Sequence, residues 1–131
     1  MKVLALDYGA AQTGVAVSDP TGAIVRPLGV VERARTASGL ARIREIVAGE
    51  EAELVVVGLP LTLRGEHGHQ ADETAAFVRL LSGALDVPVE TYDERFTTAI
   101  AAGAPGDFPE DARAAAHLLD SYLAWKSARE T

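Results

Sequence analysis

Residues 54–57, Leu-Val-Val-Val, form an unbroken apolar run near the middle of the chain, and this run constrains the fold more than any other segment. Successive side chains of a strand point to opposite faces of a sheet, so a strand of this kind must be covered on both faces. The segment before it has helical spacing, with apolar residues at Leu40, Ile43 and Val47. A strand buried on both faces and preceded by a helix predicts an α/β fold with parallel strands.

The remaining patterns predict the element order βββαβαβα, with a five-stranded mixed sheet. Short links make the first three strands an antiparallel meander, and Asp19-Pro20-Thr21-Gly22 suits the turn between the second and third. Pro88 places the fifth strand near an edge of the sheet. The expected strands cover residues 2–7, 14–19, 23–31, 53–60 and 87–92. The first expected helix ends near residue 49, and the other two cover about 70–85 and 109–128.

Length and composition limit the class of protein. With 131 residues, 48% of them hydrophobic, the chain is expected to form a single domain, 1–131. It has no cysteine, which excludes disulfides, thiolate nucleophiles and cysteine-bound zinc. The absence of a long apolar run or secretory signal predicts a cytoplasmic protein with no membrane partner. The net charge of −7 disfavours binding to nucleic acid by charge alone, although bound divalent cations would offset part of it.

Asp7 ends the first apolar strand and is the first candidate metal ligand. Burying an ionised carboxylate costs several kcal/mol unless a cation or hydrogen bonds compensate. The alternative is that Asp7 caps the strand and binds the amides of the turn around Gly9. This segment alone leaves both interpretations open.

Two further segments can bring carboxylates to the same sheet edge as Asp7. Asp93 and Glu94 follow the fifth strand, and Asp111 lies at the start of the last helix, on the stripe that borders the sheet. Because neighbours in a strand alternate faces, only one of Asp93 and Glu94 can point at Asp7. We favour Glu94 for its longer reach, with Asp93 as the alternative. Three converging carboxylates would form an all-oxygen site suited to Mg²⁺ or Mn²⁺, although Asp111 also suits a helix N-terminus.

Three further residues are candidate substrate-binding groups. Arg95 can contact a phosphate or neutralise whichever acid the metal does not use. Thr97 can bind a phosphate or cap a short helical turn. Arg64 adds positive charge to the glycine-containing loop after the fourth strand.

Taken together, four motifs resemble the YqgF/RuvX family over nearly the whole chain. The motifs, in order, are LDYGAAQTGVAVSDP, VVVGLPLTLRGEHGHQA, VETYDERFTT and DARAAAHLLDSYL. These small bacterial proteins are candidate Holliday junction resolvases or pre-16S rRNA nucleases with a ribonuclease H-like fold.

The resemblance implies a metal-dependent endonuclease that hydrolyses phosphodiester bonds. It implies that Asp7, Glu94 and Asp111 are the catalytic residues, with Mg²⁺ or Mn²⁺ as the cofactor. It also implies a role in rRNA processing and ribosome biogenesis, at the 5′ end of 16S rRNA. The expected partner is nucleic acid, pre-rRNA in preference to branched DNA, and the expected state is a monomer or a weak homodimer.

The chain departs from that family where positive charge would help to hold a polyanion. Ala11 and Gln12 replace a basic pair in the first turn, and residues 99–110 contain no basic residue. A second hypothesis is therefore a catalytically weak or inactive nucleic-acid-binding or scaffold protein of the same fold. The arginines between Arg33 and Arg44 either supply replacement charge or form a solvated helix face. A third hypothesis is nucleotide binding of the actin and sugar-kinase type, because Asp7-Tyr8-Gly9 also resembles their first phosphate loop.

Overall fold

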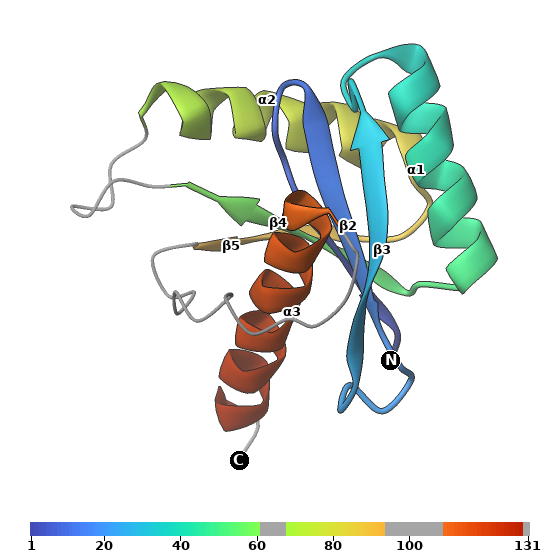
Figure 1. The fold of residues 1–131 in the computed structure, drawn as a ribbon, viewed down its shortest axis with the longest axis vertical. Helices are drawn as coiled ribbons and strands as arrows, with labels where there is room; N and C mark the ends of the chain where they lie inside the picture. The colour runs from blue at the N-terminus through green and yellow to red at the C-terminus, as the bar shows by residue number, and fades with distance from the viewer. Residues whose placement is uncertain (61–67, 94–108, 130–131) are drawn as a thin grey trace.

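A computed structural model describes residues 1–60, 68–93 and 109–129 of the chain, which form three layers with a sheet between helices (Figure 1). The observed order confirms the prediction of βββαβαβα. The elements are β1 (Val3–Asp7), β2 (Gln12–Ser18), β3 (Val25–Glu32), α1 (Ala37–Glu50), β4 (Leu54–Leu59), α2 (His69–Ala84), β5 (Val89–Asp93) and α3 (Glu110–Arg129).

Most element boundaries differ from the expected ones by a few residues. β2 begins at Gln12, before the expected Gly14, because its pairing with β3 continues to Gln12 opposite Glu32. The first helix was expected to end near Gly49, but that residue is still helical. The helix ends at Glu50, and Glu51 adopts a left-handed conformation with φ 57° and donates its N–H to the Ala48 carbonyl. Local hydrogen bonding, and not the glycine, therefore sets this end of the helix.

The sheet has the strand order β3-β2-β1-β4-β5. β1, β2 and β3 pair antiparallel as a meander, whereas β1, β4 and β5 are parallel. The edge position of β5 confirms the prediction made from Pro88. The ladder pairs Leu6 with Val57 and Leu59 with Asp93, so the carboxyl ends of the three parallel strands lie along one edge. We call this edge the carboxyl edge.

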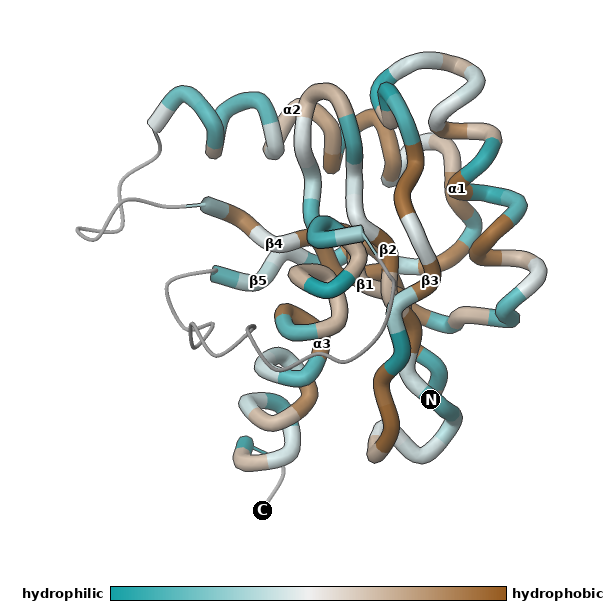
Figure 2. Tube along the Cα trace, in the orientation of Figure 1, coloured by the Kyte–Doolittle hydropathy of each residue, from teal (hydrophilic) through white to brown (hydrophobic). Residues whose placement is uncertain are grey.

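Each face of the sheet has its own hydrophobic core. Leu4 and Leu6 of β1 pack beneath α1 and α2, whereas Val3 and Ala5 pack beneath α3. Figure 2 shows the matching alternation of hydrophobic and hydrophilic residues along α1 and α3. Because side chains alternate along a strand, Asp7 continues the row that faces α3. Among the described helices, none has the length and apolar character that a membrane crossing requires.

Candidate active site

Asp7 is the last residue of β1 and lies half-buried at the carboxyl edge. In the antiparallel ladder it is paired with Gly14 of β2. The position of Asp7 is therefore fixed by the antiparallel ladder between β1 and β2 and not by a loop.

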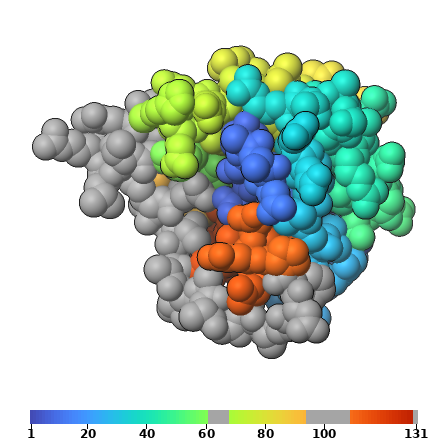
Figure 3. Space-filling model, turned by 45° about the horizontal axis from the view of Figure 1, so that its top comes forward, coloured from blue at the N-terminus to red at the C-terminus, as the bar shows by residue number. Residues whose placement is uncertain are grey.

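Asp111 approaches the same place from the other end of the chain. A Cβ atom added to Gly14 would lie 1.8 Å from the carbonyl oxygen of Asp111 and 3.0 Å from the amide nitrogen of Ala112. The first turn of α3 thus lies directly on β2, at the residue that pairs with Asp7. Figure 3 shows the same neighbourhood, with the start of α3 (orange) beside the turn that joins β1 to β2 (blue). Two of the predicted carboxylate residues are therefore neighbours in space.

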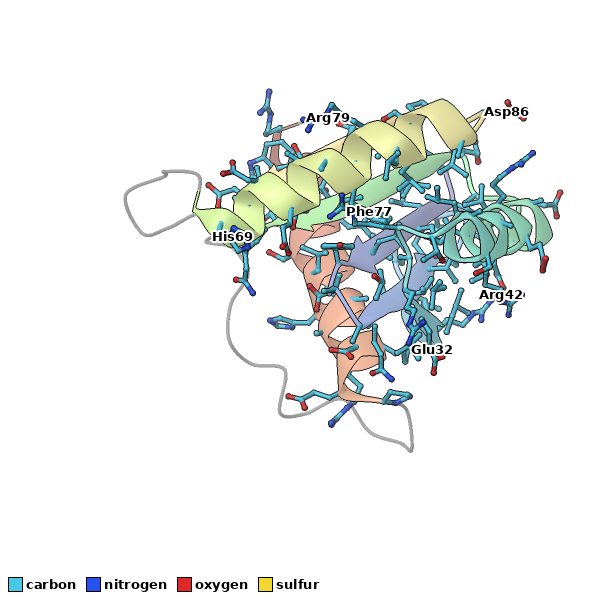
Figure 4. The ribbon with its side chains drawn as sticks, turned by 90° about the horizontal axis from the view of Figure 1, so that it is seen from above. Glu32, Arg42, His69, Phe77, Arg79 and Asp86 are labelled. Carbon is cyan, nitrogen blue, oxygen red and sulfur yellow. The ribbon has the colours of Figure 1, made fainter. Side chains whose placement is uncertain are left out.

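The turn after Asp7 is held to both β2 and α2. The Gly9 N–H donates to the Thr13 hydroxyl at 3.5 Å, and that buried hydroxyl donates to the Gly9 carbonyl at 3.4 Å. Tyr8 stacks on Phe77 of α2, with ring centroids 4.6 Å apart and an interplanar angle of 20°. Figure 4 shows Phe77 pointing from α2 toward the sheet. The turn that follows Asp7 is therefore held by its own contacts with β2 and α2.

A hollow of about 220 Å³ opens beside Asp7, and its lining includes residues that the sequence did not single out. Gln70, Glu73 and Thr74 reach it from the first two turns of α2. The Glu73 carboxylate accepts from His69 at an Nε2–Oε1 distance of 3.2 Å. Since α2 follows a parallel strand, its first turns must begin at the carboxyl edge, and this rule could have predicted a polar contribution from α2.

The candidate residues after β5 are placed only in part. Asp93 is the last residue of β5 and pairs with Leu59. Its neighbour Tyr92 packs in the core beneath α3, so the alternation puts Asp93 on the opposite face of the sheet, away from the row that contains Asp7. The remaining four candidates, Arg64, Glu94, Arg95 and Thr97, lie outside the described residues.

The donors at this edge suit a hard divalent cation. The described side chains that border the hollow offer carboxylate, amide and hydroxyl oxygens, the donor type that Mg²⁺ and Mn²⁺ prefer. Within residues 1–60, 68–93 and 109–129, no group of three histidines or acids is close enough to hold a metal by itself. The oxygen chemistry fits, and a complete ligand set requires a further donor.

One arginine is tied directly to the turn that follows β1. The Arg33 N–H donates to the Ala11 carbonyl at 3.0 Å, and the Arg33 carbonyl accepts from the Thr36 amide and hydroxyl at 3.0 and 2.7 Å. These bonds hold Arg33 at φ 47°, which is uncommon for a residue other than glycine. Arg42, by contrast, is exposed on α1 and pairs with Glu45. The arginine run is therefore a mixture of a solvated helix face and a cation beside the carboxyl edge.

The mixed sheet, with an acidic strand end and the start of α3 against it, defines the chain as a ribonuclease H-like α/β domain. The Thermus thermophilus RuvC structure superposes with a TM-score of 0.65 at 19% identity, covering 98% of this chain and 97% of that one. A second RuvC structure from that organism, titled as a complex with a Holliday junction substrate, gives a TM-score of 0.63 at 18% identity, covering 98% of this chain and 96% of that one. These matches confirm the predicted fold class.

Residues 1–125 match the model of the family described as "RuvX: Holliday junction resolvase", and the chain belongs to this family. A relative from Chloroflexus aggregans is 43% identical over 99 residues, which are 76% of this chain and 70% of the relative. A relative from Nocardia farcinica is 41% identical over 128 residues, which are 92% of this chain and 71% of the relative. Both carry the name "Putative pre-16S rRNA nuclease". The match to a relative from Chloroflexus aurantiacus spans 65% of the length of that relative. The family model and the relatives of this chain are thus both named for nucleases, as the motifs predicted.

Proposed function

We propose that this chain is a metal-dependent endonuclease that hydrolyses phosphodiester bonds in pre-16S rRNA near the 5′ end. The proposed metal ligands are Asp7, Asp111 and Glu94, with Mg²⁺ or Mn²⁺ as the cofactor. Glu94 is preferred to the alternative, Asp93, because alternation along β5 turns Asp93 away from the face that holds Asp7. The observation that carries the proposal is the contact of Gly14 with the first turn of α3, which brings Asp111 next to the strand end occupied by Asp7. We further propose that the protein acts in the cytoplasm as a monomer or a weak homodimer.

The chain's own contribution to catalysis is mainly positional. Divalent ions held by these carboxylates would supply a water of lowered pKa and neutralise charge on the phosphate. Asp7 is fixed by the β1–β2 ladder, and the Tyr8–Phe77 stack holds the adjoining turn against α2. Glu73 borders the same hollow and can orient a water beside Asp7. Arg33, tied to the turn through Ala11, can contact a phosphate of the substrate.

RNA is the preferred substrate because the relatives with 41–43% identity are named for pre-16S rRNA. The description of the family model points instead to branched DNA. Both substrates present the same phosphodiester to the carboxyl edge, so cleavage assays must include both. We expect the RNA that carries the 5′ end of pre-16S rRNA to be cut faster.

A second candidate function is a binding or scaffold protein that keeps the fold with little or no catalysis. The observation that favours it is the turn itself, where residues 8–12 contain no cation. Weak binding of a polyanion would leave an intact metal site with little turnover. Metal binding and cleavage must therefore be measured separately.

The decisive experiment compares the chain with its Asp7→Asn variant in cleavage assays with Mg²⁺ or Mn²⁺. Loss of a metal ligand should lower cleavage by at least about 100-fold. Asp86→Asn makes the same change of charge at an exposed residue, at the far end of α2 from His69 (Figure 4), and should cut like the unmodified chain. Equal cleavage by Asp7→Asn would refute the proposal.

Calorimetric titration with Mn²⁺ separates the two candidate functions. Mn²⁺ binding that Asp7→Asn abolishes, together with cleavage, supports the nuclease. The same binding without cleavage of either substrate supports the scaffold protein.

A further inference from the structure

An exposed tryptophan lies near the end of α3, on the side of the helix that meets Tyr92 of β5. Trp125 is the only tryptophan of the chain, and 40% of its surface is exposed. Its ring centroid lies 5.7 Å from that of Tyr92 and 5.9 Å from that of Tyr122. Both tyrosines are buried at 5% exposure or less, so they form a rigid base under the indole. We call Tyr92, Tyr122 and Trp125 the aromatic cluster.

Two cations accompany the aromatic cluster. The Arg129 guanidinium carbon lies 4.8 Å from the centroid of the Trp125 ring, and the Lys126 Nζ lies 5.8 Å from the centroid of the Tyr122 ring. Cations in the last turn of a helix are favoured by the helix dipole, which explains their charge. An aromatic face can stack on a nucleic-acid base, and adjacent cations can contact the phosphate of that nucleotide.

We propose that the aromatic cluster, with Lys126 and Arg129, is a binding site for single-stranded nucleic acid. An unpaired base would stack on Trp125 or on the Arg129 guanidinium, and the two cations would contact the flanking phosphates. The proposal rests on the proposed function in one respect, namely that the protein acts on nucleic acid. It adds a second place of contact, at which the substrate is held and not cut.

The length of α3 sets the span that one strand must cover to contact both Trp125 and Asp111. Trp125 lies fourteen positions after Asp111 in α3, which is about 21 Å at 1.5 Å per residue. A stacked strand rises about 3.4 Å per nucleotide, so roughly six nucleotides would span that distance. Strands shorter than this could contact Trp125 or Asp111, but not both.

The chemistry favours a single strand over a duplex. Inside a duplex the base faces are stacked on each other, so an indole ring can reach them only when a strand is unpaired. Duplex binding would have to depend on phosphate contacts, and a chain with a net charge of −7 is poorly suited to that. Glu90 accepts a hydrogen bond from the Tyr122 hydroxyl at 3.1 Å and adds a negative charge beside the cluster. Glu90→Gln should therefore bind a single strand more tightly.

The first experiment uses Trp125 as its own probe. The full chain is titrated with a ten-nucleotide single-stranded RNA in the presence of a chelator, and the tryptophan fluorescence is recorded. Because the chain has no other tryptophan, saturable quenching reports a base on Trp125. We expect quenching by single-stranded RNA, and a parallel titration with DNA of the same sequence shows whether the 2′-hydroxyl contributes. Absence of quenching, or equal quenching by a ten-base-pair duplex, would overturn the proposal.

The second experiment measures binding of a fluorescently labelled strand by anisotropy. Trp125→Ala should weaken binding at least about fivefold, whereas Trp125→Phe, which keeps a ring in the packing, should retain most of the affinity. Removing both Lys126 and Arg129 should lower the slope of log affinity against log salt concentration by about 1.4, since each phosphate contact on a single strand contributes about 0.7. Arg79→Ala, which removes an exposed arginine from α2, is the control and should leave the slope almost unchanged.

The Asp7→Asn variant separates this proposal from the proposed function. It should bind the single strand and quench Trp125 as the unmodified chain does, while it no longer cuts. Quenching without cleavage by any form of the protein would support the aromatic cluster and refute the nuclease. Unchanged affinity in Trp125→Ala would refute the aromatic cluster and leave the nuclease standing.

Discussion

Replacing Gly14 with alanine should disturb the contact that brings Asp7 and Asp111 together. The backbone of Gly14 does not have a positive φ, so alanine fits its conformation. The obstacle is steric, because the added Cβ would lie 1.8 Å from the Asp111 carbonyl oxygen and 2.3 Å from its carbon. Both atoms belong to the backbone and cannot rotate away. The first turn of α3 must move, or β2 must.

The size of the movement sets the size of the effect. Restoring an ordinary van der Waals contact requires a shift of roughly 1.5 Å. Overpacking of this kind costs about 1–3 kcal/mol, which for a domain of this length lowers the melting temperature by roughly 4–12 °C. A misplacement of about 1 Å can cost 100-fold in rate, and Gly14→Ala should lose cleavage activity by about that factor.

Gly83→Ala is the matched control because nothing lies within 4 Å of the added Cβ. It lies in α2 and should be neutral or stabilise by up to about 1 kcal/mol. Thermal unfolding followed by circular dichroism, Mn²⁺ calorimetry and cleavage should be measured on both variants. A melting temperature of Gly14→Ala equal to that of the unmodified chain would refute the close approach of α3. Lower stability with undiminished Mn²⁺ affinity would refute the role of Asp111 as a ligand.

Three further substitutions test single features of the structure. Arg33→Gly should stabilise the fold by about 1 kcal/mol in chemical denaturation, because glycine removes the strain of a positive φ, and should weaken substrate binding measured by anisotropy. Tighter binding would contradict the proposed phosphate contact. Glu73→Gln should lower Mn²⁺ affinity or cleavage about 10-fold by changing the hollow beside Asp7, and unchanged values would exclude that role. Burial raises the pKa of Asp120 above 3.8, against the opposing charge of His117, so stability is lost as pH rises through the native pKa. Asp120→Asn should therefore raise the melting temperature at pH 7, and the gain should vanish below pH 3.8.

Much of the fold could be predicted because the signals are local. The apolar run at residues 54–57 requires cover on both faces of the sheet, and both faces are covered. Pro88 cannot donate within a central ladder, and β5 is an edge strand. Short links between the first three strands allow little except a meander. The boundary at Gly49 was less predictable, because the helix end depends on bonds made by Glu51 and not on the glycine.

The candidate site was predictable in its chemistry and less so in its membership. Asp7 and Asp111 stood out because an acid at a strand end or on the sheet-facing stripe of a helix needs a partner. Glu73 did not stand out, because an acid in the first turns of a helix is ordinary. Arg33 was one of several arginines, and only its bond to Ala11 distinguishes it from Arg42.

The sequence by itself therefore determined the class of fold, the family and the kind of donor at the carboxyl edge, since periodicity, turn residues and motifs are properties of neighbouring residues. The tertiary structure alone decided which distant residues meet. Gly14 and Asp111 are separated by 97 positions and touch because a glycine leaves room for a helix backbone. Tyr92 and Trp125 form one cluster because side chains from the second half of α3 pack against Tyr92 of β5. Contacts of this range arise from packing between elements, and the spacing within either element does not encode them.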